Sequence, residues 1–495
     1  MATIVPRWEW RTFGSRFGLA DERFAALEST GIQESDETYL LGATTGNPKI
    51  RAALMDIKLL RETQSGLERW EPVMKAAFPI SGDEARRVFE TLEMPAPALD
   101  REQYSADEFV AAVSGPGGPL ERVEVHKRRV RYTVNGCTSE VTDLTANGRP
   151  TRTIAIESPD QAAVLEAVRA MGLAGYRNLN YGAGLRMALD GQPERFSVID
   201  VGTNSVKFRI GERTPAGWQT LTDRADITRL GEGLTEGGEI TPDAERRTAD
   251  AIAAMVDEAT QAGALATVAV GTAGLRAARN AAAVVDEIRA RTGVTIEVIP
   301  GDEESRLAYQ AVRAGIDLDT GSLVVFDTGG GSSQFTFGSD HRVDERFSVP
   351  VGAVRYTEAF GLADVVTPDA LAEAMAAIAA DLDRLDGRPR PDALVGMGGA
   401  VTNMAAVKHA LSPYDPDVVR GTVLDRAELD RQIELFRGRA AEDRRSIVGL
   451  QPKRADVILA GACIVRTVLD KLDVGSLTVS DRGLRDGVLV ERFGA

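Results

Sequence analysis

The sequence has little cysteine and histidine and no long uncharged apolar run. Its 495 residues include two cysteines, Cys137 and Cys463, and three histidines. These provide no disulfide framework and no thiolate or HExxH zinc site, so any metal should be held by oxygen ligands. There is no stretch of about 18 uncharged apolar residues, and the first residues lack the pattern of a signal peptide. We therefore expect a cytoplasmic protein without a membrane partner.

Basic residues are also in deficit. The chain has 58 Lys and Arg against 74 Asp and Glu, which gives a net charge of −16. This excess of acid argues against a dedicated nucleic-acid binder, although a local basic patch can exist within an acidic chain. The composition, 43% hydrophobic and 27% charged, is that of a globular protein long enough for two to four domains.

The chain changes texture near residue 190. The first part is rich in short strand-like segments, whereas the second alternates apolar strands, Gly-rich turns and Ala-rich helices. Such alternation is typical of α/β lobes that bind ligands at the carboxyl ends of their strands. We predict an N-terminal domain over 1–188, a linker over 189–195 and two lobes over 196–320 and 321–495.

Two glycine turns share one plan. DVGTNS begins at Asp200 and DTGGGSS begins at Asp327, and each follows an apolar strand. Glycines let backbone amides turn toward a phosphate, and each Asp could hold a divalent cation through water. One such turn is usually only a tight turn, but two of the same plan indicate duplicated lobes facing a shared phosphate cleft. The expected phosphate-binding residues of the two turns are Gly202, Thr203, Asn204, Ser205, Gly329, Gly330, Gly331, Ser332 and Ser333.

Together with VGTAGLRAARN, IEVIPGDEESRLAY, RADVILAGA and VSDRGLRDGVL, these turns resemble the exopolyphosphatase and guanosine pentaphosphate phosphatase family. That family belongs to the actin-like ATPase superfamily. The resemblance covers about residues 196–495. It implies two actin-like (ribonuclease H-like) α/β lobes and a phosphoanhydride hydrolase.

The resemblance also assigns site residues. The catalytic glutamate of the family falls on Glu304, and a carboxylate there suits hydrolysis because it can orient and deprotonate water. Without the resemblance, Glu304 and the acids before it would be explained as helix N-terminal residues favoured by the helix dipole. Asp200 and Asp327, with Glu304, are the expected Mg²⁺ ligands. Arg276 resembles the arginine that meets the phosphate chain, and Arg454 is a weaker candidate for phosphate contact.

One position departs from the family. Most members have an acid directly after the second glycine turn, where this sequence has Gln334. A neutral amide supplies no charge to Mg²⁺ and cannot act as a base. We therefore expect weaker metal binding or slower turnover, and a loss of activity stays open.

Basic residues alternate in the first domain. In VEVHKRRVRYTV, residues two apart project from the same face of a strand. Pairing across to acids such as Glu140 and Glu157 would explain any one of these strands, but several together favour a polyanion channel. The expected polyanion-binding residues are Lys49, Arg51, Lys58, Lys127, Arg129 and Arg131.

The order of these strands resembles the CYTH fold, the triphosphate tunnel family, which implies a β-barrel lined by Lys, Arg and Glu. The family's ExExK motif reads Arg7-Trp8-Glu9-Trp10-Arg11 here, so that a base replaces one of its acids. Acids that would hold a metal are thus depleted. We predict that this domain binds triphosphate or polyphosphate rather than cleaving it.

The sequence supports three functional hypotheses. The first is a Mg²⁺-dependent exopolyphosphatase that removes terminal orthophosphate from inorganic polyphosphate. The second keeps the fold but acts on guanosine pentaphosphate (pppGpp), since nothing in these residues reads a guanine. The third is a catalytically weak polyphosphate or nucleotide sensor. A sugar kinase ranks last because no sugar site is recognisable, and a homodimer is expected by analogy alone.

Overall fold

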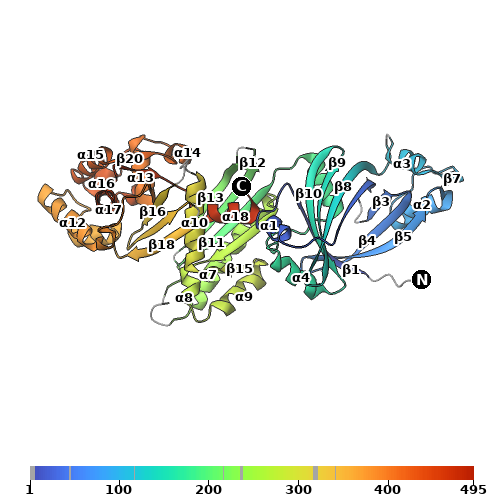
Figure 1. Ribbon diagram of the computed structural model, residues 1–495, viewed down its shortest axis with the longest axis horizontal. Coiled ribbons are helices and arrows are strands. Elements are labelled where there is room, and N and C mark those ends of the chain that lie inside the picture. The colour runs from blue at the N-terminus through green and yellow to red at the C-terminus, as the bar shows by residue number, and fades with distance from the viewer. Residues whose placement is uncertain are drawn as a thin grey trace. The chain divides into compact units, whose positions relative to one another are not determined.

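The computed structural model describes residues 6–43, 46–115, 117–203, 205–215, 217–232, 234, 238–315, 321–340 and 342–494 (Figure 1). It divides into two compact units. The first unit comprises Met1–Ala269, Arg279–Ile296 and Leu489–Ala495, and the second comprises Val270–Ala278 and Glu297–Val488. Residues 270–278 and 297–315, which we predict for the first lobe, belong to the second unit.

The first unit begins with a closed barrel of eight antiparallel strands in the order β1-β10-β9-β8-β2-β3-β4-β5. Tight turns with positive φ, such as Asn135-Gly136, join consecutive strands. This architecture confirms the barrel that the CYTH resemblance predicts. The strands are β1 (Arg7–Gly14), β2 (Gly31–Leu41), β3 (Asn47–Arg51), β4 (Leu54–Gln64), β5 (Leu67–Ala77), β8 (Glu121–Val134), β9 (Cys137–Ala146) and β10 (Arg149–Ser158).

Short helices surround the barrel. A small layer of β6 (Ile80–Ser81), α2 (Gly82–Thr91), β7 (Gln103–Tyr104) and α3 (Ala106–Ser114) buries its apolar side chains against β3, β4 and β5. Ser81 and Ser105 begin the two helices with capping boxes. The remaining helices of this region are α1 (Leu19–Ala25), α4 (Gln161–Ala170) and α5 (Tyr181–Asp190). The first turn of α5 places Tyr181 at the barrel interior.

A five-stranded sheet follows, in the order β13-β12-β11-β14-β15. Its first three strands form an antiparallel meander. Thr241 caps the long helix α7, which packs on β11 and β12. The elements are β11 (Arg195–Val201), β12 (Ser205–Thr214), β13 (Gly217–Ile227), α7 (Pro242–Gln261), β14 (Ala266–Gly271), α8 (Ala273–Ala277), α9 (Ala281–Thr292) and β15 (Ile296–Val298).

The second unit holds a six-stranded sheet in the order β18-β17-β16-β19-β21-β20. It also begins with an antiparallel meander, and β19 then joins β16 in parallel. The repeated plan confirms two α/β lobes. The elements are α10 (Gly301–Gly315), β16 (Ser322–Thr328), β17 (Ser333–Ser339), β18 (Arg342–Val349), α11 (Ala353–Phe360), α12 (Pro368–Asp381), β19 (Ala393–Met397), α13 (Gly398–Lys408), α14 (Pro416–Val419), β20 (Val423–Asp425), α15 (Arg426–Arg437), α16 (Ala441–Arg444), α17 (Ile458–Lys471), β21 (Ser476–Val479) and α18 (Leu484–Phe493).

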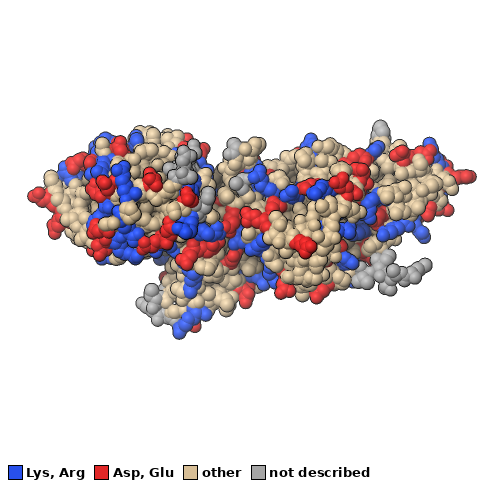
Figure 2. Space-filling view, in the orientation of Figure 1, with Lys and Arg blue, Asp and Glu red and all other residues tan. Residues whose placement is uncertain are grey.

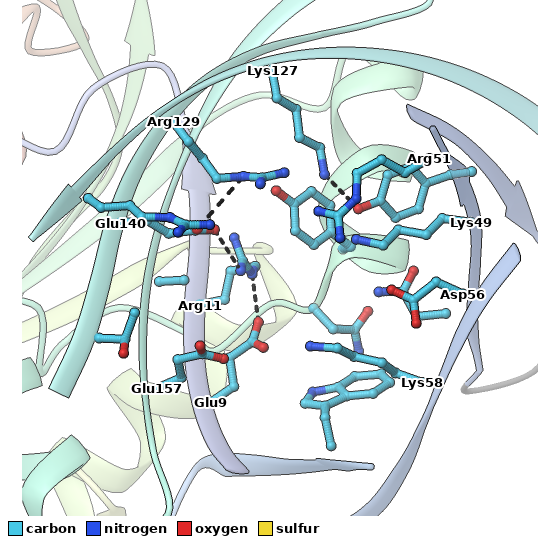
Figure 3. A pocket seen from close by; sticks show the side chains of 18 of the residues that line it. Glu9, Arg11, Lys49, Arg51, Asp56, Lys58, Lys127, Arg129, Glu140 and Glu157 are labelled. Atoms are coloured by element: carbon cyan, nitrogen blue, oxygen red, sulfur yellow. Dashed lines mark hydrogen bonds and ion pairs between the residues drawn. The ribbon is translucent and has the colours of Figure 1, made fainter. Parts of the chain in front are cut away.

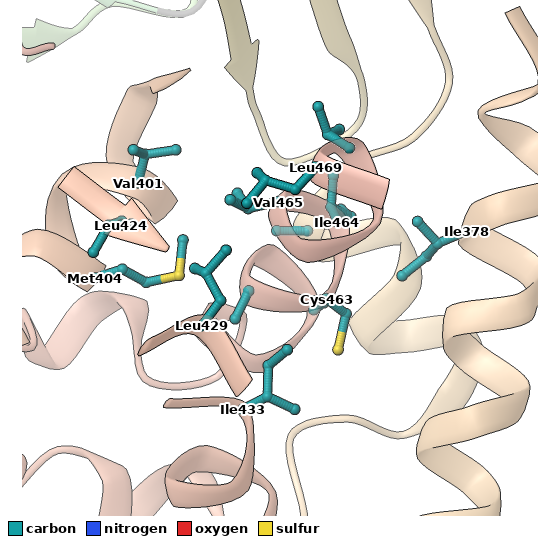
Figure 4. Close-up of a cluster of buried hydrophobic side chains, with 14 of the residues drawn as sticks. Ile378, Val401, Met404, Leu424, Leu429, Ile433, Cys463, Ile464, Val465 and Leu469 are labelled. Atoms are coloured by element: carbon teal, nitrogen blue, oxygen red, sulfur yellow. The ribbon is translucent and has the colours of Figure 1, made fainter. Parts of the chain in front are cut away.

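The core of the second unit forms around α17. Every residue from Ile458 to Val465 is buried, as expected for the apolar run ILAGACIV. Side chains from α12, α13, β20 and α15 pack against this helix, among them Ile378, Met404 and Leu429 (Figure 4). A central helix that is apolar all round requires such a shell.

The predicted alternation of strand, turn and helix is only partly correct. Helices do follow the turns after β14, β15 and β19. After Asp200 and Asp327, however, the chain reverses into an antiparallel strand, β12 or β17. The short apolar segments after each turn alternate between buried and less buried positions, which is the periodicity of a strand.

Residues 489–494 return to the first unit. Phe493 stacks on Phe196 of β11 with ring centroids 4.5 Å apart, and the indole nitrogen of Trp218 donates to the Gly494 carbonyl at 3.1 Å. The phenol of Tyr176 contacts the carbonyls of Phe17 and Arg492, both at 3.4 Å. The barrel and the first sheet therefore share one apolar junction.

Among the described helices, none combines the length and the apolar character needed to cross a bilayer. On the face shown in Figure 2, acidic and basic side chains are interspersed rather than gathered into one patch.

Candidate functional site

The two glycine turns have the same backbone geometry. The amide of Gly202 donates to the carbonyl of Ser205 at 3.0 Å, and the amide of Gly329 donates to the carbonyl of Ser332 at 2.9 Å. Both turns follow a strand that ends near an aspartate. Asn204 lies outside the described residues. The shared geometry supports the prediction of two turns of one plan.

The predicted residues are divided between the units. The first unit holds Asp200, Gly202, Thr203 and Ser205. The second holds Arg276, Glu304, Asp327, Gly329, Gly330, Gly331, Ser332, Ser333 and Arg454. The prediction that the turns face one phosphate cleft concerns both units and stays a prediction.

Asp200 has a basic neighbour that the sequence reasoning missed. Its side chain is buried near the end of β11, directly opposite Lys207 of β12. The Lys207 Nζ lies 3.7 Å from Asp200 Oδ2, and half of the lysine side chain is exposed. The sequence could have indicated Lys207, because a tight hairpin turn after Gly202 brings position 207 opposite position 200.

Asp327 is surrounded by three strands and a glycine. It lies opposite Gln334 of β17 and beside Met397 of the parallel strand β19. Its Oδ1 occupies the place where a side chain at position 398 would begin. Gly398 also has φ of +86°. A third glycine turn, Gly396–Gly399 between β19 and α13, is therefore shaped around the Asp327 carboxylate.

We expect the Gly398→Ala variant to displace Asp327 and to lower catalytic turnover about a hundredfold or more. A left-handed backbone costs a non-glycine residue about 1–2 kcal/mol, and the new methyl group overlaps Oδ1. Steady-state kinetics and thermal unfolding would measure the two effects. The matched control is Gly475→Ala in the same unit, where nothing lies within 4 Å of the added carbon. Wild-type turnover in Gly398→Ala would contradict this role.

Glu304 and Arg276 form an ion pair in the second unit. Arg276 Nη2 lies 3.0 Å from Glu304 Oε2, and its Nη1 donates to the Ile299 carbonyl at 2.8 Å. Both side chains are about one quarter exposed. The neighbouring Glu303 instead pairs with Arg306 at 2.6 Å. Glu304 and Glu303 thus pair with different arginines. The Arg276 guanidinium is held by Glu304 through Nη2 and by the Ile299 carbonyl through Nη1.

Arg454 lies against the second and third glycine turns. A side chain at Gly399 would meet its Nη2 at 2.6 Å, so the guanidinium packs directly over that glycine. A small cavity of about 20 Å³ is lined by Arg454 together with Gly329 and Gly330. This placement supports a phosphate contact from Arg454.

The serines of the second turn have different surroundings. Ser333 is fully buried, and its hydroxyl donates to the Val351 carbonyl at 2.7 Å. Its proton is therefore used to hold the turn. The hydroxyl oxygen of Ser332 accepts from the side-chain amide of Gln334 at 2.9 Å. Nothing in the structure supports a phosphate contact from Ser333.

The barrel encloses a pocket of about 310 Å³, here called the barrel pocket (Figure 3). Its lining includes eight basic and four acidic side chains, an excess of four positive charges. All six predicted polyanion-binding residues line it, namely Lys49, Arg51, Lys58, Lys127, Arg129 and Arg131. Arg11 and Lys75 add two further cations. The period-two pattern of β8 thus located the interior face correctly, with Arg128 exposed outside.

One buried carboxylate organises these cations. Glu37 of β2 contacts Lys127 at 2.9 Å, Arg129 at 2.8 Å, Lys49 at 3.3 Å and Arg51 at 3.6 Å. Burial alone would raise the pKa of Glu37, but the surrounding cations hold it well below its usual range. One carboxylate cannot neutralise four cations, so the cluster keeps a positive charge.

Lys127 is almost completely buried within this cluster. Its ammonium group donates to the phenol of Tyr39 at 2.6 Å and lies 3.8 Å from the ring centre of Tyr181. Burial lowers the pKa of Lys127 well below its usual value, although Glu37 opposes this. The sequence reasoning missed both Glu37 and the two tyrosines. Strand register would have singled out Glu37, because it lies opposite Arg51.

Comparison with known proteins concerns mainly the part after the barrel. Residues 209–494 match the Ppx/GppA phosphatase family. Exopolyphosphatase 2 of Mycobacterium tuberculosis is 28% identical over 320 residues, which cover 61% of this chain and 99% of the relative. Exopolyphosphatase 1 of Mycobacterium leprae is 27% identical over 308 residues, covering 60% and 89%. The crystal structure of the type II variant of the Aquifex aeolicus Ppx/GppA phosphatase is similar at a TM-score of 0.57 and 31% identity, covering 60% of this chain and 99% of that one.

Proposed function

Since this chain belongs to the Ppx/GppA phosphatase family, we propose that it is an exopolyphosphatase, which releases terminal orthophosphate from inorganic polyphosphate. The exopolyphosphatases among its relatives support this substrate. The observation that carries the proposal is the ion pair of Glu304 and Arg276. It places a water-activating carboxylate beside a guanidinium fork that suits a phosphate oxygen pair.

In the proposed mechanism, Glu304 orients a water molecule and accepts its proton as the oxygen attacks the terminal phosphorus in line with the departing chain. Arg276 binds phosphate oxygens with its Nη2 group while the Ile299 carbonyl holds Nη1 in place. The amides of the glycine turns and the Arg454 guanidinium would take further oxygens. The protonated terminal phosphate then leaves as orthophosphate.

Asp200, Asp327 and Glu304 each offer carboxylate oxygens, the ligands that Mg²⁺ prefers, and among the described residues no three acidic, His or Cys side chains gather into a ready metal site. Asp327 is the most clearly prepared, because Gly398 leaves its Oδ1 room that any side chain would fill. A bound Mg²⁺ would supply charge neutralisation for the phosphate oxygens. We propose Asp327 as a principal ligand.

Gln334 lies opposite Asp327 on the adjacent strand, so its replacement by glutamate would place a second carboxylate beside the first. We expect the Gln334→Glu variant to bind Mg²⁺ several-fold more tightly and to turn over faster at low Mg²⁺. Titration of Mg²⁺ against phosphate release would measure this. The control is Gln310→Glu on α10. A Mg²⁺ dependence identical to that of wild type would remove Gln334 from the explanation of metal affinity.

We further propose that the barrel pocket holds a part of the same polymer. Its excess positive charge and buried tyrosines suit a phosphate chain, and retention there would raise the local concentration of substrate for the phosphatase region. Guanosine pentaphosphate is the second candidate substrate because its terminal phosphoanhydride presents the same chemistry. The third candidate, a polyphosphate sensor with little turnover, rests on Gln334.

The test is Mg²⁺-dependent phosphate release by the full chain from long-chain polyphosphate, guanosine pentaphosphate and ATP. Preferential release from polyphosphate would support the exopolyphosphatase. Preference for guanosine pentaphosphate would instead select the second candidate. Polyphosphate binding without release from any of the three substrates would select the sensor.

A further inference from the structure

The barrel pocket differs from a metal site in how its acids are used. Four carboxylates line it: Glu9, Asp56, Glu140 and Glu157. Arg11 Nε lies 2.7 Å from Glu9, and its Nη2 lies 3.1 Å from Glu140. Glu157 pairs with Arg7 at 3.1 Å. Three of the four lining acids are therefore already paired with arginine.

Arg11 is fixed in its place between two of these acids. Its Nη1 reaches the Thr153 hydroxyl at 3.4 Å, and its guanidinium lies 4.3 Å from the ring centre of Tyr181. Only 6% of the residue is exposed. A divalent cation could reach Glu9 and Glu140 only by displacing a buried, stacked guanidinium, which would leave that charge without its partners. The arginine thus occupies the position that a metal would need.

The opposite side of the barrel pocket offers positive charge and unused donors. Lys49, Arg51, Lys127 and Arg129 all contact the carboxylate of Glu37, and Arg129 also lies 3.7 Å from Glu140. The Tyr181 hydroxyl is buried without a hydrogen-bond partner, and the residue is 8% exposed. A buried hydroxyl left unpaired is costly unless a ligand supplies an acceptor. Phosphate oxygens are acceptors of the required charge.

Asp56 is the remaining acid of the lining. It is 9% exposed, and its Oδ1 has no hydrogen-bond partner. Lys49 of β3 lies directly opposite Asp56, and Lys58 lies two residues after Asp56 on β4. A single carboxylate among so many cations could bind either a proton-bearing phosphate or a metal. Replacing Asp56 therefore distinguishes the binding of a phosphate from the binding of a metal.

From these contacts we infer that the barrel pocket binds a chain of three or more phosphates as a free polyanion, without a divalent cation. The identity of the polymer rests on the proposed function, whereas the metal-free mode of binding does not. Mg²⁺ then has opposite effects in the two parts of the protein. It assists hydrolysis at the Asp327 site and withdraws the free polyanion from the barrel pocket by complexing it.

The test is isothermal titration of the full chain with tripolyphosphate in EDTA and again in excess Mg²⁺. We expect binding in EDTA and an affinity several-fold weaker in Mg²⁺. Lys58→Glu should weaken binding in EDTA about tenfold or more. The matched control is Arg61→Glu on the same strand, because Arg61 pairs with Glu71 outside the barrel pocket.

Asp56→Asn decides between the anion and the metal. Binding in EDTA that is retained or strengthened supports a metal-free pocket, since the change removes a negative charge. Binding that appears only with Mg²⁺ and is lost in Asp56→Asn overturns it, as does equal binding by the Lys58→Glu and Arg61→Glu variants. ATP serves as a second ligand. If ATP binds as tightly as tripolyphosphate, the barrel pocket accepts triphosphate tails in general. If ATP binds more weakly, the barrel pocket prefers inorganic chains. Both results support a polyanion site in the barrel pocket.

Phosphate release is measured separately on the same protein. Binding in EDTA without release in Mg²⁺ would refute the exopolyphosphatase and leave the inference intact. Phosphate release in Mg²⁺ without binding in EDTA would support the exopolyphosphatase and refute the inference.

Discussion

The Glu304→Gln variant is expected to release orthophosphate from polyphosphate about 10²–10⁴-fold more slowly than wild type. Glutamine keeps the shape of the side chain but cannot accept a proton from water. Arg276 loses its ionic partner at 3.0 Å and keeps its bond to the Ile299 carbonyl, so it remains available to phosphate. The loss should therefore appear in kcat, with KM unchanged or lower.

The adjacent residue provides the control for this experiment. Glu303 precedes Glu304 on the same helix turn but pairs with Arg306. Glu303→Gln should retain turnover within a few-fold. An equal loss in both variants would indicate that the acids only stabilise the start of α10. Full turnover in Glu304→Gln would remove this residue from the mechanism.

The second large effect concerns the stability of the barrel. Replacing Glu37 with Gln leaves Lys49, Arg51, Lys127 and Arg129 without their common counter-charge in a largely buried cluster. Removing one partner of a buried charge cluster typically costs about 3–5 kcal/mol. We expect the free energy of barrel unfolding to fall by this amount. Three of the four tryptophans, Trp8, Trp10 and Trp70, lie in barrel strands, so fluorescence during urea unfolding reports on it.

The effect should depend on pH with a defined sign. The folded-state pKa of Glu37 is lowered, so its stabilising contribution is present above the unfolded pKa of about 4.3 and is lost as the pH falls below it. The difference in stability between wild type and Glu37→Gln should thus be constant near neutral pH and shrink in acid. Glu34→Gln, an exposed change on the same strand, is the control. A difference that does not vary down to pH 3 would contradict this account.

The sequence predicted which residues of β8 line the barrel, but it did not predict Glu37 and Tyr181, which contact them. Alternation on β8 was enough to identify Lys127, Arg129 and Arg131, because the face of a strand depends only on local periodicity. Glu37 was missed because Glu34 and Asp36 lie close to it on β2, and its position opposite Arg51 of β3 is what distinguishes it. Tyr181 was missed because nothing in the sequence of α5 shows that its first turn enters the barrel.

The same limit applies to the phosphatase site. Asp200, Asp327, Glu304 and Arg276 were predicted from contiguous motifs, and their roles stay predictions. Lys207 and the position of Gly398 against Asp327 depend on pairing between strands or between a strand and a distant turn. The hydroxyl of Ser333 was assigned to phosphate from residue type alone, and its contact with Val351 shows how a buried neighbour can use the same group.

The return of residues 489–494 to the first unit has a consequence for biosynthesis. A ribosome produces Phe196 and Trp218 nearly 300 codons before Phe493 and Gly494, on which they pack. At about 5–20 residues per second, the nascent first sheet waits roughly 15–60 s for these partners. The barrel, whose strands are contiguous between residues 7 and 158, can close during that time. The aromatic side chains of Phe196 and Trp218 therefore lack these partners until residues 489–494 have been synthesised.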